Sequence, residues 1–143
     1  MSLDDPRKKM SKSNPNPNSY ISMLDEPKVI EKKIKRAVTD SDMDIRFDPV
    51  QKPAISNLLS IYSLLTGQSM EDTVSHFSGS GYGQFKKELA EVTVGTLRPI
   101  QEKYHQYLNS ADLDDILEEG AQKAEKVANE TLAQVKKALG IGG

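Results

Sequence analysis

The sequence predicts an all-α fold, a helical bundle preceded by an irregular N-terminal arm that is rich in proline and asparagine. Apolar residues recur at helical spacing through most of the chain after residue 25, and only residues 45–47 resemble a strand. The arm contains Asn14–Asn18, where two prolines remove backbone donors and favour extended neighbours. We therefore expect a loop and linker over residues 1–24 and a helical domain over residues 25–143.

The first two helices are predicted from Pro27 to Val38 and from Pro53 to Thr66. Pro27 suits a first helical turn, with an acidic residue before it, and Gly67 is a suitable stop for the second helix. An acidic connection over residues 38–48 separates them. Apolar stripes mark both helices, the first through Val29, Ile30, Ile34, Ala37 and Val38, and the second through Ile55, Leu58, Leu59, Tyr62 and Leu65.

Three further helices are expected. A capping-box-like start at Ser69 predicts a short helix to Phe77. A longer helix from Gln84 to Leu108 contains Pro99, which we expect to kink the helix without ending it. The last runs from near Ser110 to Leu139, with Gly120 as a potential break. The apolar seams are Phe85, Leu89, Val92, Thr96, Ile100 and Tyr104, then Leu117, Ala121, Ala124, Ala128, Leu132, Val135 and Leu139.

Composition excludes several kinds of protein. The 143 residues suit about one domain, and the absence of cysteine excludes disulfides and thiolate metal sites. The two histidines, His76 and His105, are far apart, so no metal centre is predicted. No apolar run approaches the roughly 18 residues of a membrane span, and the charged start is unlike a signal peptide. We expect a cytoplasmic protein without membrane contact.

Charge is distributed unevenly along the chain. Residues 1–36 carry nine Lys and Arg against five Asp and Glu, residues 37–74 carry two against six, and residues 75–143 carry eight against ten. A basic start on a chain of net charge −2 indicates a local anion site and not a basic nucleic-acid-binding domain.

The candidate anion site is Lys8-Lys9-Met10-Ser11-Lys12-Ser13. A non-helical loop with lysines at positions 9 and 12 can bring two cations and several N–H and O–H donors to one polyphosphate. A solvated basic tail is the other interpretation of the charge pattern alone.

Other constellations have weaker claims. Residues 40–44 imitate the start of a calcium loop, but Ile45 and Gln51 stand where Gly and Glu belong, which favours a solvated acidic turn. Residues 79–83 predict a flexible interhelical loop in which Tyr82 packs or caps. Tyr104 and His105 have no candidate nucleophile beside them in sequence.

The string Lys9-Met10-Ser11-Lys12-Ser13 matches the KMSKS loop of class I aminoacyl-tRNA synthetases. The chain also resembles bacterial tryptophanyl-tRNA synthetases along nearly its whole length. The segments that carry this resemblance are residues 34–41, 56–59, 66–69, 81–83 and 97–101. One departure is Asn14, where the close bacterial pattern often has Asp.

The resemblance implies an ATP-dependent tryptophan–tRNA ligase whose loop closes over the phosphates of ATP, with Mg²⁺. Lys9 and Lys12 are then the catalytic contacts, and Met10, Ser11 and Ser13 hold the loop and the nucleotide. The helices that follow face the tRNA(Trp) anticodon, with Lys32, Lys35 and Arg36 as candidate contacts. The complete enzyme is expected to be a homodimer.

The family's nucleotide-binding half normally precedes this loop, so the chain is expected to be a C-terminal fragment that is inactive alone and binds no cofactor tightly. A free-standing helical RNA-binding module without catalysis is the alternative, and self-association of the isolated chain is a third possibility.

Overall fold

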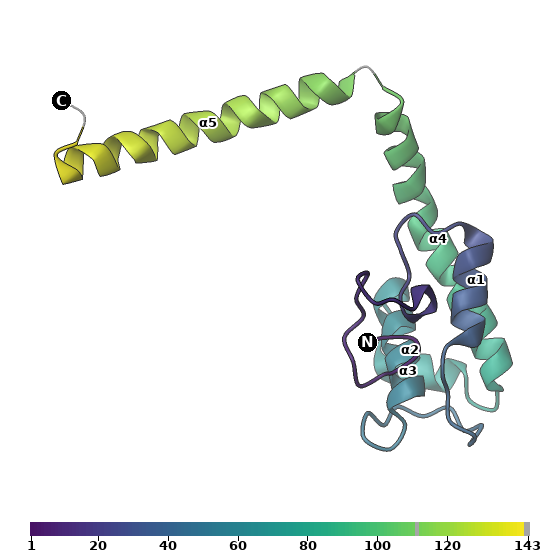
Figure 1. Ribbon diagram of the computed structural model, residues 1–143. Coiled ribbons are helices and arrows are strands. Elements are labelled where there is room, and N and C mark those ends of the chain that lie inside the picture. Colours follow the sequence, from purple (N-terminus) through teal and green to yellow (C-terminus); the bar gives the residue numbers. More distant parts are fainter. Residues whose placement is uncertain (111, 142–143) are drawn as a thin grey trace. The chain divides into compact units, whose positions relative to one another are not determined.

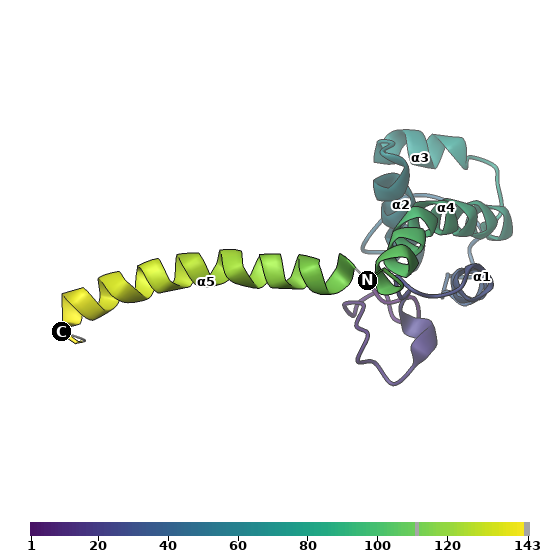
Figure 2. The same cartoon turned by 90° about the horizontal axis from the view of Figure 1, so that it is seen from above.

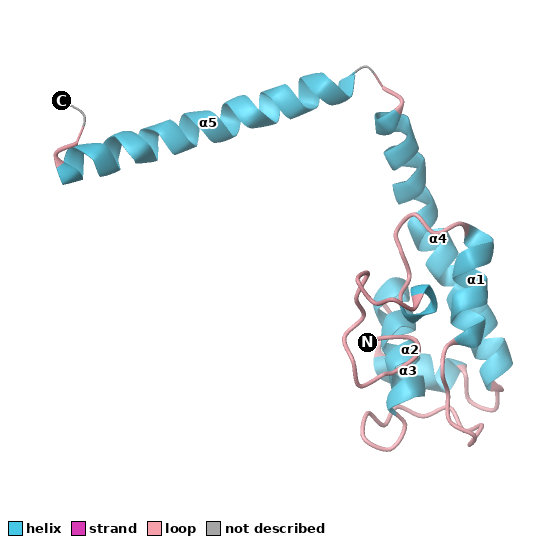
Figure 3. Cartoon of the chain, in the orientation of Figure 1, coloured by secondary structure: helices cyan, strands magenta, loops and turns pink. Residues whose placement is uncertain are grey.

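The computed structural model describes residues 1–110 and 112–141, and all regular structure within them is helical (Figure 3). The all-α prediction is therefore confirmed. Residues 45–47, which resemble a strand in sequence, form no strand in the described part of the chain. The elements are a 3-10 turn, η1 (Pro17–Ser19), and α1 (Pro27–Arg36), α2 (Pro53–Thr66), α3 (Met70–His76), α4 (Tyr82–Leu108) and α5 (Asp112–Leu139). The chain forms two compact units, Met1–Gln101 and Glu102–Gly143.

The core of the first unit contains three aromatic rings that come from successive parts of the chain. Tyr62 of α2 lies 4.9 Å from Phe77, which directly follows α3, and Phe77 lies 4.7 Å from Phe85 of α4. Both pairs meet edge to face, the arrangement that the ring quadrupoles favour. The aliphatic side chains buried around them are Ile30, Ile34, Ile55, Leu58, Leu59 and Leu89.

α1 lies beside the first half of α4 (Figures 1 and 2) and ends two residues before the predicted end at Val38. The backbone turns extended at Ala37, and the Val38 amide donates to the Leu3 carbonyl at 2.8 Å. The Lys86 ammonium donates to the Ala37 carbonyl at 2.7 Å. Contacts with distant segments thus end this helix, which explains why the local pattern extended it too far.

The bounds predicted for α2 are confirmed, with Gly67 in the left-handed conformation at its C-terminus (φ 72°). The predicted start of α3 is also confirmed, because the Ser69 hydroxyl accepts from the Asp72 amide at 3.1 Å. α3 ends at His76, one residue earlier than predicted, and Phe77 leaves the helix with its ring in the core.

α4 begins two residues before the predicted start at Gln84 and continues through Pro99. The prediction that Pro99 does not end the helix is confirmed, while the kink stays a prediction. Only the N-terminal half of the predicted apolar seam is buried, since Phe85 and Leu89 are fully enclosed but Ile100 is 43% exposed.

α5 belongs to the second unit and is unbroken, so the break considered at Gly120 is wrong. A single glycine costs about 1 kcal/mol, too little to divide a helix of this length. Acidic residues in its first turn and lysines in its last complement the helix dipole. The Ser110 hydroxyl accepts from the Asp112 amide near the predicted start, and Gly140 follows the predicted end at Leu139.

The sequence analysis expected the apolar seam of α5 to contribute to a bundle core. This expectation is wrong, because no described residue of α5 is buried. Across residues 1–110 and 112–141, no helix combines the length and apolarity that crossing a membrane requires.

Tyr62, His76 and Glu88 form a polar cluster at the edge of the aromatic core. The Tyr62 hydroxyl donates to Glu88 at 2.6 Å, and Nε2 of His76 lies 2.7 Å from the same carboxylate oxygen. Burial, assisted by the neighbouring carboxylate, raises the pKa of Tyr62 to about 12. The Tyr62 hydroxyl, and to a lesser extent His76, hold the pKa of Glu88 below its usual value, so this carboxylate stays charged.

We expect Leu59→Ala to lower the free energy of unfolding by roughly 2–5 kcal/mol, because it opens a cavity in the core. Leu64→Ala on the same helix is the matched control. Leu64 is 82% exposed whereas Leu59 is fully buried, so the control should change stability by less than about 0.5 kcal/mol. Urea denaturation of both variants measures the difference, and equal losses would contradict the assigned core.

The Glu88 cluster predicts a pH-dependent contribution to stability. A carboxyl whose pKa is lower in the folded state stabilises the fold above its unfolded pKa, and this contribution disappears as the pH falls below about 4.5. Glu88→Gln should therefore destabilise the protein at pH 7 and much less at pH 3.5. Denaturant unfolding at the two pH values measures this. Glu91→Gln, which changes an exposed glutamate of the same helix, should show no such pH-dependent difference.

Candidate functional site

Residues 3–19 form a loop whose two ends are joined at the base. The Leu3 amide donates to the Ser19 carbonyl at 2.9 Å. Leu3 and Ser19 are both buried, and the Leu3 carbonyl accepts from Val38 beyond α1. This 3–19 loop is thus an Ω-type loop, which projects from a fixed base on the helical unit.

The five predicted site residues lie together on this loop. Met10 is partly buried against the hydrophobic core, whereas Lys9, Ser11, Lys12 and Ser13 are exposed. A turn follows Met10, in which the Asn14 amide donates to the Ser11 carbonyl at 3.2 Å and the Ser11 and Ser13 hydroxyls lie 2.9 Å apart. Met10 therefore anchors the string, and the turn presents Lys12 at its tip.

The four cations of the loop divide into two paired and two free ones. Asp5 forms ion pairs with Arg7 and Lys8, each at 3.3 Å. The Arg7 amide, together with these two side chains, holds the pKa of Asp5 below its usual value. Lys9 and Lys12 form no ion pair with the described residues. The ammonium groups of Lys9 and Lys12 are thus exposed and are not neutralised by the described residues.

Asn16, which the sequence does not distinguish from the rest of the irregular arm, connects several parts of the loop. It forms hydrogen bonds with Asp4, Asn14, Asn18 and Ser19. The available signal was the Asn-Pro-Asn-Pro-Asn pattern, because Asn side chains often bond the backbone two residues further on. That pattern does not identify the long-range partner Asp4. The arm is also not wholly irregular, since Pro17 opens η1 with Asn16 as its N-cap.

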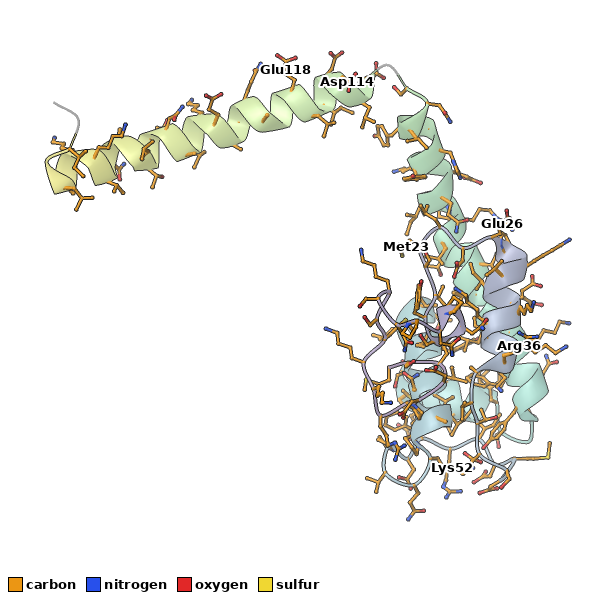
Figure 4. The ribbon with its side chains drawn as sticks, viewed as in Figure 1. Met23, Glu26, Arg36, Lys52, Asp114 and Glu118 are labelled. Carbon is orange, nitrogen blue, oxygen red and sulfur yellow. The ribbon has the colours of Figure 1, made fainter. Side chains whose placement is uncertain are left out.

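The linker after the loop is held against α1 and α4. The Lys33 ammonium, which is buried, pairs with Asp25 at 2.6 Å and lies 4.9 Å from the centre of the Tyr20 ring. Gln101 donates to the carbonyls of Met23 and Asp25 at 2.8 and 3.0 Å, just before α1 begins (Figure 4). The linker therefore has fixed contacts at its C-terminal end.

A second buried lysine organises the acidic connection after α1. Lys52 (Figure 4) donates to the Asp44 carbonyl at 2.5 Å and to the Tyr82 hydroxyl at 3.0 Å, and it pairs with Asp40 and Asp42 at 3.4 and 3.2 Å. Burial alone would lower the pKa of Lys52, but its bonds to Tyr82 and Asp42 outweigh burial and raise it. Asp42 and Asp44 are exposed, as expected for a solvated acidic turn, and this turn also binds the Lys52 ammonium.

The ring of Tyr82 is buried, which confirms the predicted packing, and its hydroxyl donates to Asp40 at 2.7 Å. Tyr82 and Gly83 lie in α4, so the prediction of an interhelical loop over residues 79–83 is wrong for these two residues. Within the described residues, no group of three or more His, Asp or Glu side chains could hold a metal ion.

The candidate tRNA contacts lie on an exposed basic face of α1. Lys32, Lys35 and Arg36 are all exposed, and Figure 4 shows Arg36 at the C-terminal end of the helix. A groove of about 620 Å³ runs beside this face, between α1 and α4. Burial lowers the pKa of Lys86 in this groove. The lining residues are Glu31, Lys35, Tyr82, Gly83, Lys86, Lys87, Ala90 and Glu91.

Comparisons with known proteins agree with this architecture. The chain is 61% identical over 142 residues to the tryptophan–tRNA ligase of Halalkalibacterium halodurans and 52% identical to that of Bacillus subtilis. It is also similar to the crystal structure of tryptophanyl-tRNA synthetase from Mycoplasma pneumoniae, with a TM-score of 0.86 at 35% identity. Each match covers 99% of this chain and 43% of the other protein, so the chain spans less than half the length of these relatives.

The family model that matches the chain is described as tRNA synthetases class I (W and Y). It matches residues 1–98, which include the 3–19 loop and all of α1, α2 and α3. A model match over more than half of the chain, together with relatives above 50% identity, establishes membership. The chain therefore belongs to the class I tRNA synthetases of the tryptophan and tyrosine group.

Proposed function

We propose that the chain acts as part of a tryptophan–tRNA ligase. In this role the 3–19 loop holds the phosphates of ATP during tryptophan activation, and residues 25–143 engage tRNA(Trp). The observation that carries the proposal is the pair of exposed, unneutralised ammonium groups of Lys9 and Lys12 on a loop with a fixed base. The choice of tryptophan as the substrate amino acid rests on the names of the relatives, which are tryptophan–tRNA ligases.

In the activation step, a carboxylate oxygen of tryptophan attacks the α-phosphorus of ATP, and the bond from that phosphorus to the pyrophosphate oxygen breaks. Negative charge grows on the departing pyrophosphate, and preorganised cations stabilise such charge most strongly in the transition state. Lys12, at the tip of the turn, follows the pyrophosphate as it leaves, while Lys9 holds the phosphates from the other side of Met10. Mg²⁺ bound to ATP supplies further charge neutralisation.

The neighbouring residues bind and orient. Met10 fixes the middle of the string on the core, and the hydroxyls of Ser11 and Ser13 shape the turn that carries Lys12. Because the match covers only 43% of each ligase, the opposing wall of the nucleotide site would be supplied by the part of the ligase that this chain does not span, in a homodimeric cytoplasmic enzyme. Without that wall the proximity contribution to catalysis is lost, and the chain alone is inactive.

A free-standing RNA-binding module is the second candidate. It is favoured by the exposed basic face of α1 and by the lysines of the groove between α1 and α4. The two proposals share the tRNA surface and differ in whether Lys12 takes part in adenylation.

Lys12→Ala should lower the kcat of tryptophan-dependent ATP–pyrophosphate exchange by at least about tenfold, because the contact strengthens in the transition state. The KM for tryptophan should change little. The measurement uses a chimera in which residues 1–143 replace the matching segment of the Bacillus subtilis tryptophan–tRNA ligase.

Lys8→Ala is the matched control, because Lys8 lies on the same loop but its charge is already paired with Asp5. Its kcat should stay near that of the unaltered chimera. The isolated chain, assayed alongside, should show no exchange. Equal losses of kcat in both variants would contradict the role of Lys12, and exchange by the isolated chain would contradict the need for further residues.

The basic face of α1 predicts salt-dependent tRNA binding. Replacing both Lys35 and Arg36 by Ala should weaken binding of tRNA(Trp) to the chain. The slope of log affinity against log salt should become shallower by about 1.5, as expected for two lost phosphate contacts. Filter binding between 50 and 200 mM salt provides the measurement. Replacing both Lys136 and Lys137 of α5 by Ala is the control, because it removes the same amount of charge. An equal change in slope would contradict a specific role of α1 in tRNA binding.

A further inference from the structure

Asn16 stands out on the 3–19 loop because all four of its polar groups are engaged. Its backbone amide donates to Asn14 Oδ1 at 2.9 Å, and its backbone carbonyl accepts from the amide and hydroxyl of Ser19 at 3.1 and 2.7 Å. Its side-chain oxygen accepts from the Asn18 amide at 3.1 Å and so caps η1. Its side-chain nitrogen donates to Asp4 Oδ2 at 2.7 Å.

The bond to Asp4 differs from the others because it crosses the loop. Asp4 lies immediately after the Leu3 end of the base, on the limb that leads to Lys9, whereas Asn16 lies on the limb that returns from Lys12. The other oxygen of Asp4 accepts from the Ser2 hydroxyl at 2.5 Å. These two donors hold the pKa of Asp4 below its usual value, so the acceptor is a carboxylate at neutral pH. Hydrogen bonds to charged acceptors are shorter and stronger than neutral ones.

We propose that Asn16 is a positioning residue for adenylation, whose amide bridge to Asp4 joins the two limbs of the 3–19 loop and thereby sets where Lys9 and Lys12 meet the triphosphate. The inference rests on the proposed function. It adds a residue that touches neither ATP nor tryptophan and acts through the placement of the two lysines.

The geometry explains why one bridge has such an effect. Leu3 and Ser19 close the base, and the Asp4–Asn16 bridge closes the loop a second time, above the base. The Asn14–Asn16 bond then connects this second closure directly to the turn that carries Lys12. Without the bridge the return limb can shift while the base stays intact, and displacements near 1 Å can cost about 100-fold in rate.

Asn16→Asp tests the bridge at its donor. The substitution keeps the side-chain oxygen that caps η1, but it removes the donor to Asp4 and places two carboxylates face to face. Adding Asp4→Asn restores one donor and one acceptor across the loop with the roles exchanged. Asn18→Ala is the matched control, because Asn18 is a neighbouring loop asparagine whose side chain makes only a 3.4 Å contact with Asn16.

The first measurement is amide hydrogen exchange in the 143-residue chain, which does not depend on any activity. Asn16→Asp should speed exchange of the loop amides, including that of Asn14, by roughly tenfold, as expected for loss of a charge-assisted bond. The double variant should return toward the original rate, and Asn18→Ala should not change it. Unchanged exchange in Asn16→Asp, or no rescue by Asp4→Asn, would overturn the bridge.

The second measurement is pyrophosphate exchange in the Bacillus subtilis chimera. Asn16→Asp should lower kcat by roughly tenfold with little change in the KM for tryptophan, and Asp4→Asn should restore it. If Lys12→Ala lowers kcat but Asn16→Asp does not, the positioning role is wrong and the proposed function stands. If neither lowers kcat, the proposed function fails, and with it the role of Asn16 in adenylation, whereas hydrogen exchange still decides whether the bridge exists.

Discussion

Two backbone hydrogen bonds of Leu3 hold the 3–19 loop in place on the helical unit. The Leu3 amide bonds to Ser19, which closes the loop, and its carbonyl bonds to Val38, which attaches that closure to the segment after α1. Burial of the Leu3 side chain excludes water from both bonds. The segment that carries Lys9 and Lys12 is thereby attached at a fixed point to the helical unit.

Lysine has two opposite roles in this protein, and its partners decide between them. Lys33 and Lys52 are buried, and each satisfies its ammonium with carboxylates or carbonyls of a connecting segment. Removing one partner from such a pair leaves an uncompensated charge, so these two contacts fix the paths of the linker and of residues 40–44. Lys9 and Lys12 instead keep their ammonium groups in solvent, where an external anion can reach them.

The two units of the chain rest on different kinds of stabilisation. Residues 1–101 enclose an aromatic and aliphatic core, with polar networks at Glu88 and Lys52 along its edges. In α5 no side chain is buried, and its described contacts are local, such as the Glu119–Lys123 pair at 2.5 Å. A continuous apolar seam in a sequence therefore indicates a helix with one apolar face, but it does not show that this face is covered within the same chain.

The sequence by itself determined the helical class, the bounds of α2, the cap of α3 and the string that carries Lys9 and Lys12. These features depend on periodicity, capping residues and motif letters, all of which are local. Only the tertiary structure decided where α1 ends, which cations Asp5 neutralises and how Asn16 joins the limbs of the loop. Those outcomes depend on side-chain direction and on hydrogen bonds between residues far apart in sequence, such as the bond from Val38 to Leu3. Such bonds leave no periodic pattern in the sequence.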